Sequence, residues 1–209
     1  MQFDMEGTFG DDYLYFYAES IDDEHSDADT AEILALLGLA PGSTILDAPC
    51  GHGRLSRRLA AAGMRVTGVD LTHAYLDLAR ADPKLAPDAV TYLEGDVRAL
   101  PVTGPYDAVV CWLNSFGYYD DADCHTVLAE FHRVLRPQGM LMLVFQIGDE
   151  QGHRTDFRGT PVSVDWYRQQ PQDLTGLLRQ TGFELWTTAV REPAGSERVA
   201  QGYILARKQ

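Results

Sequence analysis

The chain has 209 residues, of which 45% are hydrophobic and 23% are charged, and its net charge is −14. This length and composition predict one soluble globular domain. The acidic balance disfavours a nucleic-acid partner, because binding to phosphates depends on Lys and Arg. No run of residues approaches the about 20 apolar residues that a membrane helix needs, and the acidic start MQFDMEGTFGDD is unlike a signal peptide. We therefore expect a cytoplasmic protein with no membrane partner.

The negative charge is concentrated at the N-terminus. Twelve Asp and Glu precede Arg54 without any Lys or Arg, whereas the later residues carry 17 positive and 19 negative charges. Such a segment is either a solvated face that aids solubility or an acidic lid that attracts a cationic substrate such as an amine.

The three cysteines, Cys50, Cys111 and Cys124, form no C-x-x-C pair. The sequence also contains no cluster of His, Cys, Asp and Glu with the spacing of metal ligands. We therefore expect neither a disulfide framework nor a metal site.

Strand-like and helix-like segments alternate from Thr44 onward. Apolar runs predict buried strands at Thr44–Cys50, Arg65–Asp70, Val90–Leu93, Tyr106–Leu113 and Met140–Gln146. Helical spacing of apolar residues predicts helices at Arg54–Ala62, His73–Ala81 and Cys124–Arg136. This alternation is typical of a parallel sheet with helices on both faces.

The pattern changes after Gln146. The segment Ile147–Arg168 is polar and predicts irregular structure, and a helix is predicted for Pro171–Thr181. Two further strands, Phe183–Glu192 and Glu197–Arg207, are joined by a short Pro-Ala-Gly-Ser link, which indicates an antiparallel hairpin. The predicted fold class is α/β: a doubly wound, Rossmann-like sheet of about seven strands with a C-terminal antiparallel hairpin and helices on both faces.

The stretch ILDAPCGHGR, Ile45 to Arg54, contains the densest functional signal. In a doubly wound sheet, ligands bind beyond the carboxyl ends of the strands, where the strand order reverses. Gly51 and Gly53 lie at such an end, and glycine leaves room for a ligand close to the backbone. Asp70 ends the second strand, where a carboxylate can accept hydrogen bonds from both hydroxyls of a ribose. The ligand is therefore predicted to be a nucleoside.

A dinucleotide is one alternative for this ligand. The dinucleotide fingerprint G-x-G-x-x-G requires a third glycine, but the chain has Ser56 at that position. Asp96, in the run Glu94-Gly95-Asp96-Val97 after the third strand, is placed to accept from an exocyclic amine. The turn Arg136-Pro-Gln-Gly139 and the terminal hairpin are not dehydrogenase features, so a nicotinamide oxidoreductase is the weaker interpretation.

Taken together, the segments from about Thr44 to the C-terminus resemble the class I S-adenosylmethionine-dependent methyltransferases. ILDAPCGHG is similar to their first motif, VTGVD to the second and YLEGDVRALP to the third, and FHRVLRPQGMLML is similar to the helix, turn and strand that follow their fourth strand. The resemblance implies in-line methyl transfer from the cofactor S-adenosyl-L-methionine, which needs alignment and exclusion of water rather than a metal. A protein that binds this cofactor without turnover is the alternative.

The resemblance also implies which residues bind the cofactor. Asp47, Gly51 and Gly53 surround the methionine moiety, Asp70 holds the ribose, and Asp96 with Val97 contacts the adenine. The predicted cofactor-binding set is completed by Ala48, Cys50, Leu71 and Trp112.

The residues after the fourth strand indicate a small-molecule acceptor. Many base-modifying nucleic-acid methyltransferases carry [DN]-P-P-[YF] there, whereas this chain has WLNSFGYY. The S-x-G-Y pattern and the N-terminal YLYFY are similar to the amino-sugar N-methyltransferases, which implies that Tyr13 and Tyr17 cover the cofactor and that Tyr118 faces the acceptor. Alternatively, Tyr13 and Tyr17 form one packed face of a helix and Tyr118 is an ordinary loop aromatic.

Two histidines are candidates for proton transfer. Tyr118 and His153 are the candidate catalytic residues. His153, in the polar segment, is a candidate acid–base residue because imidazole titrates near neutral pH. His52 lies in the glycine turn, at a position that tolerates many residues.

The predicted layout of the single domain has four parts. Residues 1–40 form an N-terminal helical lid, 41–146 the cofactor-binding core, 147–170 a substrate-facing segment, and 171–209 the C-terminal helix and hairpin. Because the substrate-facing segment is short, either the acceptor is small or the site is open and is completed by the second subunit of a homodimer.

Overall fold

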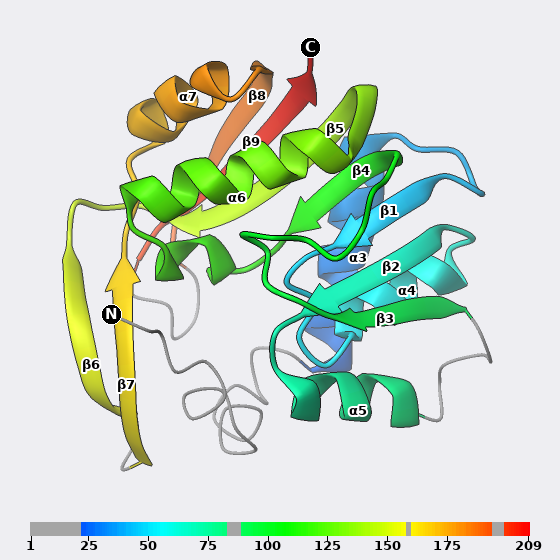
Figure 1. The fold of residues 1–209 in the computed structure, drawn as a ribbon, viewed down its shortest axis with the longest axis horizontal. Helices are drawn as coiled ribbons and strands as arrows, with labels where there is room; N and C mark the ends of the chain where they lie inside the picture. Colours follow the sequence, from blue (N-terminus) through cyan, green and yellow to red (C-terminus); the bar gives the residue numbers. More distant parts are fainter. Residues whose placement is uncertain (1–21, 83–88, 158–159, 194–198) are drawn as a thin grey trace.

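The computed structural model describes residues 22–82, 89–157, 160–193 and 199–209, and its centre is a seven-stranded sheet in the order β3-β2-β1-β4-β5-β9-β8 (Figure 1). The strands are β1 (Thr44–Asp47), β2 (Arg65–Asp70), β3 (Val90–Glu94), β4 (Tyr106–Cys111), β5 (Leu135–Gln146), β8 (Phe183–Arg191) and β9 (Gln201–Lys208). Strands β1 to β5 pair in parallel, whereas β9 runs antiparallel to both β5 and β8. The predicted fold class is confirmed, including the antiparallel C-terminal hairpin.

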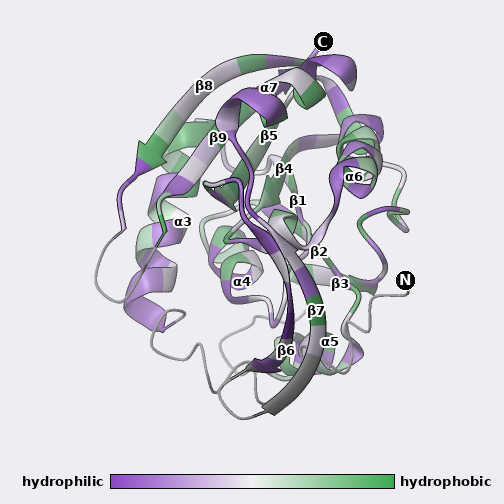
Figure 2. Cartoon of the chain, turned by 90° about the vertical axis from the view of Figure 1, so that its left-hand side faces the viewer, coloured by the Kyte–Doolittle hydropathy of each residue, from purple (hydrophilic) through white to green (hydrophobic). Residues whose placement is uncertain are grey.

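Helices cover both faces of the sheet. Their bounds are α3 (Asp23–Leu37), α4 (Arg54–Ala61), α5 (His73–Ala81), α6 (Asp121–Val134) and α7 (Pro171–Gln180). The first three pack on one face and the last two on the other, and Figure 2 shows the sheet between α6 on one side and α3 and α4 on the other. Leu59 and Leu76 are fully buried on the first face, as are Phe131 and Leu178 on the second. Burial of each such side chain contributes about 1.5–3 kcal/mol.

The sequence near the helix ends explains where the helices begin and stop. The carboxylate of Asp22 caps α3 by accepting from the backbone N–H of His25 at 2.8 Å. Asp120 caps α6 by accepting from the backbone N–H of Asp123 at 2.9 Å. Gly38 ends α3 with a φ of 58°, a left-handed conformation that favours glycine.

The largest difference from the predicted bounds in the core is at β5. This strand begins at Leu135, five residues before the predicted Met140, and so includes the expected turn at Pro137–Gly139. The turn remains as an irregularity, because Gln138 has a φ of 64° and the pairing of β4 with β5 shifts register between Tyr106 and Ala108. Pairing with β4 therefore extends the strand through residues that were expected to interrupt it.

The prediction of irregular structure after β5 was wrong. Two strands, β6 (Gln151–Phe157) and β7 (Thr160–Tyr167), pair antiparallel in a separate sheet beside the main one (Figure 1). β6 is hydrophilic along most of its length (Figure 2) and lacks the alternating apolar pattern by which strands are recognised, whereas β7 carries this pattern at Val162, Val164 and Trp166. Cross-strand pairing makes this segment extended.

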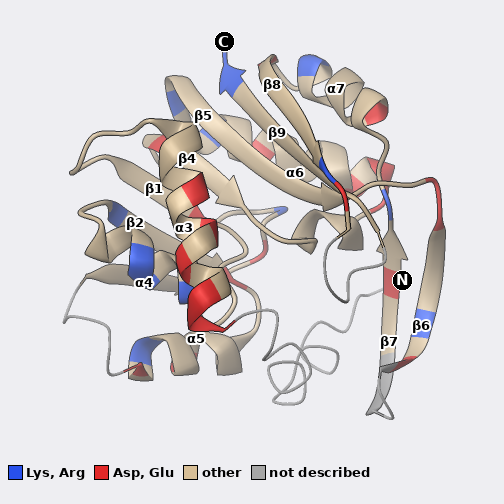
Figure 3. Ribbon diagram, turned by 180° about the vertical axis from the view of Figure 1, so that it is seen from behind, with Lys and Arg blue, Asp and Glu red and all other residues tan. Residues whose placement is uncertain are grey.

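The N-terminal acidic segment is described from Asp22 onward, so Tyr13 and Tyr17 lie outside the described residues. In the described part, carboxylates gather on α3, which packs beside α4 (Figure 3). Arg58 of α4 binds Asp23 and Asp27 at 2.5 Å each, and Arg54 binds Asp29 at 2.7 Å. Among the described residues, no helix has the length and apolar character needed to cross a membrane.

Candidate active site

The two glycines of the turn after β1 have different surroundings. Both have left-handed backbones, with φ of 54° at Gly51 and 74° at Gly53. A Cβ added at Gly51 would meet no atom within 4 Å, whereas a Cβ at Gly53 would lie 2.8 Å from Cζ of Tyr92 and 3.0 Å from Cβ of Ala79. The open space that a ligand needs therefore lies over Gly51, and Gly53 is required by packing inside the protein.

The buried side chain of Asp47 stabilises the start of this turn. Its carboxylate is buried and accepts a hydrogen bond from the hydroxyl of Ser56 at 2.5 Å. Burial raises the pKa of Asp47 to about 7, although the bond from Ser56 and the charge of Arg54 oppose the rise. Ser56 stands where the dinucleotide fingerprint would have its third glycine. In the structure, its hydrogen bond to Asp47 joins α4 to the end of β1.

Asp70 connects the end of β2 to the glycine turn. One carboxylate oxygen accepts from the backbone N–H of Gly51 at 2.7 Å, and the other accepts from the backbone N–H of Thr72 at 2.9 Å. Burial raises the pKa of Asp70, and these two bonds oppose the rise. A carboxylate can accept about four hydrogen bonds, so capacity remains for a ligand hydroxyl. The glycine turn after β1 and the end of β2, which were predicted to bind one ligand together, are therefore in direct contact.

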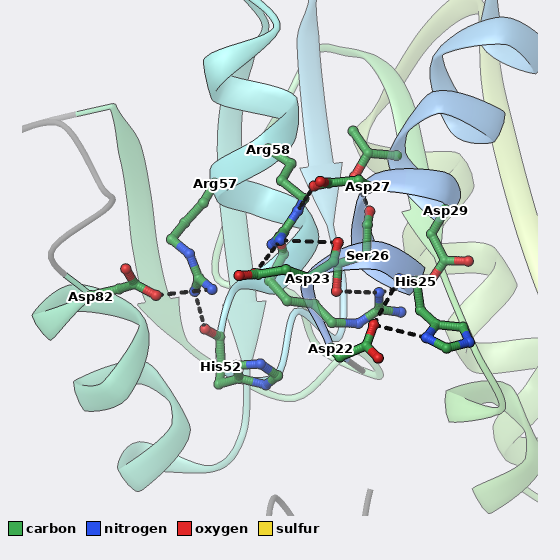
Figure 4. Close-up of polar contacts among 12 residues, drawn as sticks. Asp22, Asp23, His25, Ser26, Asp27, Asp29, His52, Arg57, Arg58 and Asp82 are labelled. Atoms are coloured by element: carbon green, nitrogen blue, oxygen red, sulfur yellow. Dashed lines mark hydrogen bonds and ion pairs between the residues drawn. The ribbon is translucent and has the colours of Figure 1, made fainter. Parts of the chain in front are cut away.

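The side chain of His52, between the two glycines, is a weak base. Burial, together with the charges of Arg57 and Arg54, lowers the pKa of His52 to about 4. Its backbone carbonyl accepts from Arg57 at 2.7 Å, and Arg57 also pairs with Asp82 at 3.0 Å (Figure 4). His52 is thus neutral, and its main-chain contact links the turn to α4.

A pocket of about 200 Å³ lies beyond the carboxyl ends of the strands. It is lined by residues from four segments: the turn after β1, the ends of β2 and β3, the short 3₁₀ helix η1 (Ser115–Tyr118) with the start of α6, and β7. The lining residues are Pro49, Leu71, Gly95, Asp96, Val97, Arg98, Tyr118, Tyr119, Asp120, Asp123, Asp165 and Tyr167. In the strand order, β1 lies between β2 and β4, so the pocket is at the point where the order reverses.

A network of ion pairs fixes one side of this pocket. Arg98 donates from Nε and Nη2 to the carboxylate of Asp96, at 2.6 Å for the shortest bond, and from Nη1 to Asp123 at 2.9 Å. Burial by itself would raise the pKa of Asp96, but the bonds from Arg98 outweigh it and the pKa lies below its ordinary value. Asp96 is therefore held ionised at the end of β3.

The structure places the predicted site residues in three groups. Leu71, Asp96, Val97 and Tyr118 line the pocket, and Gly51 and Asp70 meet beside the turn. Asp47, at the end of β1, and Ala48, Cys50 and Gly53, within the turn, are buried, and Trp112 packs edge-on against Tyr203 in the core at 5.8 Å between ring centroids. Tyr13 and Tyr17 lie outside the described residues.

His153 is connected to the pocket through Asp165 on the paired strand β7. Its Nδ1 lies 2.8 Å from Oδ1 of Asp165, and Asp165 lines the pocket. The two residues are direct partners across β6 and β7, as are Gln151 and Tyr167, so all four side chains lie on one face of the hairpin.

Sequence reasoning missed four of the charged residues that line the pocket. Arg98, Asp120, Asp123 and Asp165 are ordinary charged residues in the sequence, and only their meeting in space marks them. Asp120 was available as a helix-capping signal, because it directly precedes α6. The pairing of Asp165 with His153 depends on the β6–β7 register, which the sequence does not display.

Comparison with known proteins identifies the architecture. A family model described as a methyltransferase domain matches residues 45–139. Residues 45–139 are thus similar to a methyltransferase domain. A solved S-adenosylmethionine-dependent methyltransferase from Methanosarcina mazei superposes with a TM-score of 0.72 at 21% identity, over 84% of this chain and 96% of that one.

Curated relatives differ in the acceptor that their names give. A malonyl-[acyl-carrier protein] O-methyltransferase from Serratia marcescens is 37% identical over 110 residues, which are 51% of this chain and 41% of the relative. A glycine/sarcosine N-methyltransferase from Halorhodospira halochloris is 32% identical over 145 residues, which are 65% of this chain and 53% of the relative. The chain thus spans about half the length of these relatives, and the similarity covers both an O- and an N-methyltransferase.

Proposed function

We propose that the protein transfers a methyl group from S-adenosyl-L-methionine to a small-molecule acceptor. The observation that carries the proposal is the bond between Asp70 and the backbone of Gly51, which joins the predicted ribose and methionine sites beside a pocket. The methyltransferase domain match and the similar fold of an S-adenosylmethionine-dependent enzyme support the same cofactor.

The described residues fit this cofactor in three respects. The space over Gly51 can accept a group close to the backbone, which a side chain at this position would block. The carboxylate of Asp70 is fixed by two backbone N–H groups and can still accept ribose hydroxyls. Asp96 is held ionised beside Leu71 and Val97, so it can accept from the amino group of an adenine between two apolar side chains.

The cofactor supplies an activated methyl group, so the residues of this chain need only align the acceptor and exclude water. Tyr118 and Tyr167 also line the pocket, and we place the acceptor beside them. We assign His153, which is bonded to Asp165, as the residue that takes the acceptor proton. Tyr13 and Tyr17 are proposed to close over the cofactor.

Two finer properties are part of the proposal. The acidic composition and the paired state of Arg98 support a site that does not take nucleic acid. A homodimer that completes the pocket stays a prediction, which light scattering of the purified protein tests.

Calorimetry with S-adenosylhomocysteine tests the cofactor assignment. Asp70→Asn keeps the size of the side chain but removes its charge, and each lost charge-assisted hydrogen bond is worth about 1.5–3 kcal/mol. We expect binding by the intact protein and an affinity about 10- to 100-fold lower in Asp70→Asn. Asp77→Asn, on the exposed side of α5, is the matched control and should bind normally. Absence of binding by the intact protein would refute the proposed function.

A further inference from the structure

The pocket as a whole has an uneven charge. Its lining includes the four carboxylates of Asp96, Asp120, Asp123 and Asp165, but the guanidinium of Arg98 is the single Lys or Arg side chain among the described lining residues. Acidic residues are therefore in excess around a space that is large enough for a small molecule.

The one guanidinium is already paired with two carboxylates. Its Nε and Nη2 donate to Asp96 and its Nη1 donates to Asp123, so its positive charge is offset by the protein. Two of its five N–H groups remain for a ligand, but an anionic acceptor would also face the carboxylates of Asp120 and Asp165. The charges around the pocket therefore disfavour carboxylate acceptors.

The remaining walls of the pocket suit a cation. The rings of Tyr118, Tyr119 and Tyr167 line it, and aromatic faces attract ammonium groups through their negative π-face. The protein already shows such a contact here, because the guanidinium carbon of Arg98 lies 6.0 Å from the centre of the Tyr119 ring.

Asp165 differs from the other three carboxylates in its partner. Asp96 and Asp123 are paired with the permanent charge of Arg98, and Asp120 caps α6 through the backbone N–H of Asp123. Asp165 instead contacts the imidazole of His153, which carries no charge in its neutral form. This contact gives the side chain of Asp165 a fixed orientation at the pocket.

Building on the proposed function, we infer that the methyl acceptor is an amine that binds to Asp165 as its ammonium ion, while His153 holds this carboxylate in place. The ammonium gives one proton to His153 before methyl transfer, so that the nitrogen lone pair forms the N–C bond while the S–C bond of the cofactor breaks. Asp165 is thus a specificity-determining residue, and His153 has a positioning role in addition to the proton transfer proposed above. The curated relatives leave this choice open, because their names include both an O- and an N-methyltransferase.

The inference is tested by calorimetry on the complex with S-adenosylhomocysteine, using two probes that share a benzyl group and carry opposite charges, benzylamine and phenylacetate. We expect benzylamine to bind the wild-type complex at least about tenfold more tightly than phenylacetate, since one charge-assisted hydrogen bond is worth this factor. Equal binding of the two probes, or tighter binding of phenylacetate, would overturn the inference. Failure of S-adenosylhomocysteine to bind would instead overturn the proposed function.

Variants then test the two named residues. In Asp165→Asn the preference for benzylamine should fall to within about threefold, whereas Asp77→Asn should leave it unchanged. His153→Gln retains a donor to Asp165 and should keep the preference, while His153→Ala should reduce it without altering the affinity for S-adenosylhomocysteine. A preference that survives Asp165→Asn would reject the role of this carboxylate. Should a variant fail to fold, the wild-type comparison of the two probes still decides the acceptor class.

Discussion

The two glycines of the turn after β1 allow a sharp test of where the ligand lies. Alanine at either position must adopt a left-handed backbone, which costs about 1–2 kcal/mol. At Gly51 the added methyl group enters open space, so this strain is the whole effect on stability. At Gly53 the methyl group also meets the ring of Tyr92, and such overpacking costs about 1–3 kcal/mol more.

Urea denaturation and calorimetry should therefore rank the two variants in opposite orders. Gly53→Ala should lose about 2–5 kcal/mol of unfolding free energy and Gly51→Ala about 1–2 kcal/mol. The affinity for S-adenosylhomocysteine should fall further in Gly51→Ala, because its methyl group occupies the space assigned to the cofactor. The same rank order in both assays would contradict the placement of the ligand over Gly51.

Tyr92 provides an internal control for this reasoning. The nearest atom to the added methyl group of Gly53→Ala is the hydroxyl oxygen of Tyr92. Tyr92→Phe removes this atom, so the double variant should regain about 1 kcal/mol or more relative to the sum of the single changes. Strict additivity of the two changes would show that Tyr92 is not the source of the cost.

Two further predictions concern charged groups near the turn. The pKa of Asp47 rises from its ordinary 3.8 to about 7 on folding, so the folded state binds the proton more tightly and stability falls as the pH rises from about 4 to 7. Asp47→Asn removes this loss, which is on the order of 4 kcal/mol. In urea denaturation, the unfolding free energy of Asp47→Asn relative to wild type should therefore increase from about pH 4 to pH 7. A difference that stays constant with pH would contradict the raised pKa of Asp47. Arg58→Ala should cost about 1 kcal/mol at low salt and less in 1 M NaCl, because its partners Asp23 and Asp27 are exposed. A loss that does not depend on salt would indicate packing rather than charge.

The sequence by itself determined the order of the elements and the cofactor end of the site. Apolar runs and helical spacing are local signals, and they placed β2 and α5 at their observed bounds. The parallel arrangement then follows from the alternation of strands and helices, and it brings the ends of β1 and β2 together. Asp70 and the glycine turn could be paired in advance because this geometry is general for doubly wound sheets.

The acceptor end was decided by tertiary structure. β6 has no apolar alternation, so its pairing with β7 defines it as a strand, and the register of that pairing brings His153 to Asp165. Arg98 and Asp123 are 25 residues apart and meet because the loop after β3 lies against the start of α6. Contacts between distant residues depend on the packing of whole elements, which local patterns do not encode. Likewise, the sequence placed two glycines at the turn, but only the tertiary structure distinguishes them. Tyr92 packs against Gly53, whereas the space over Gly51 is open.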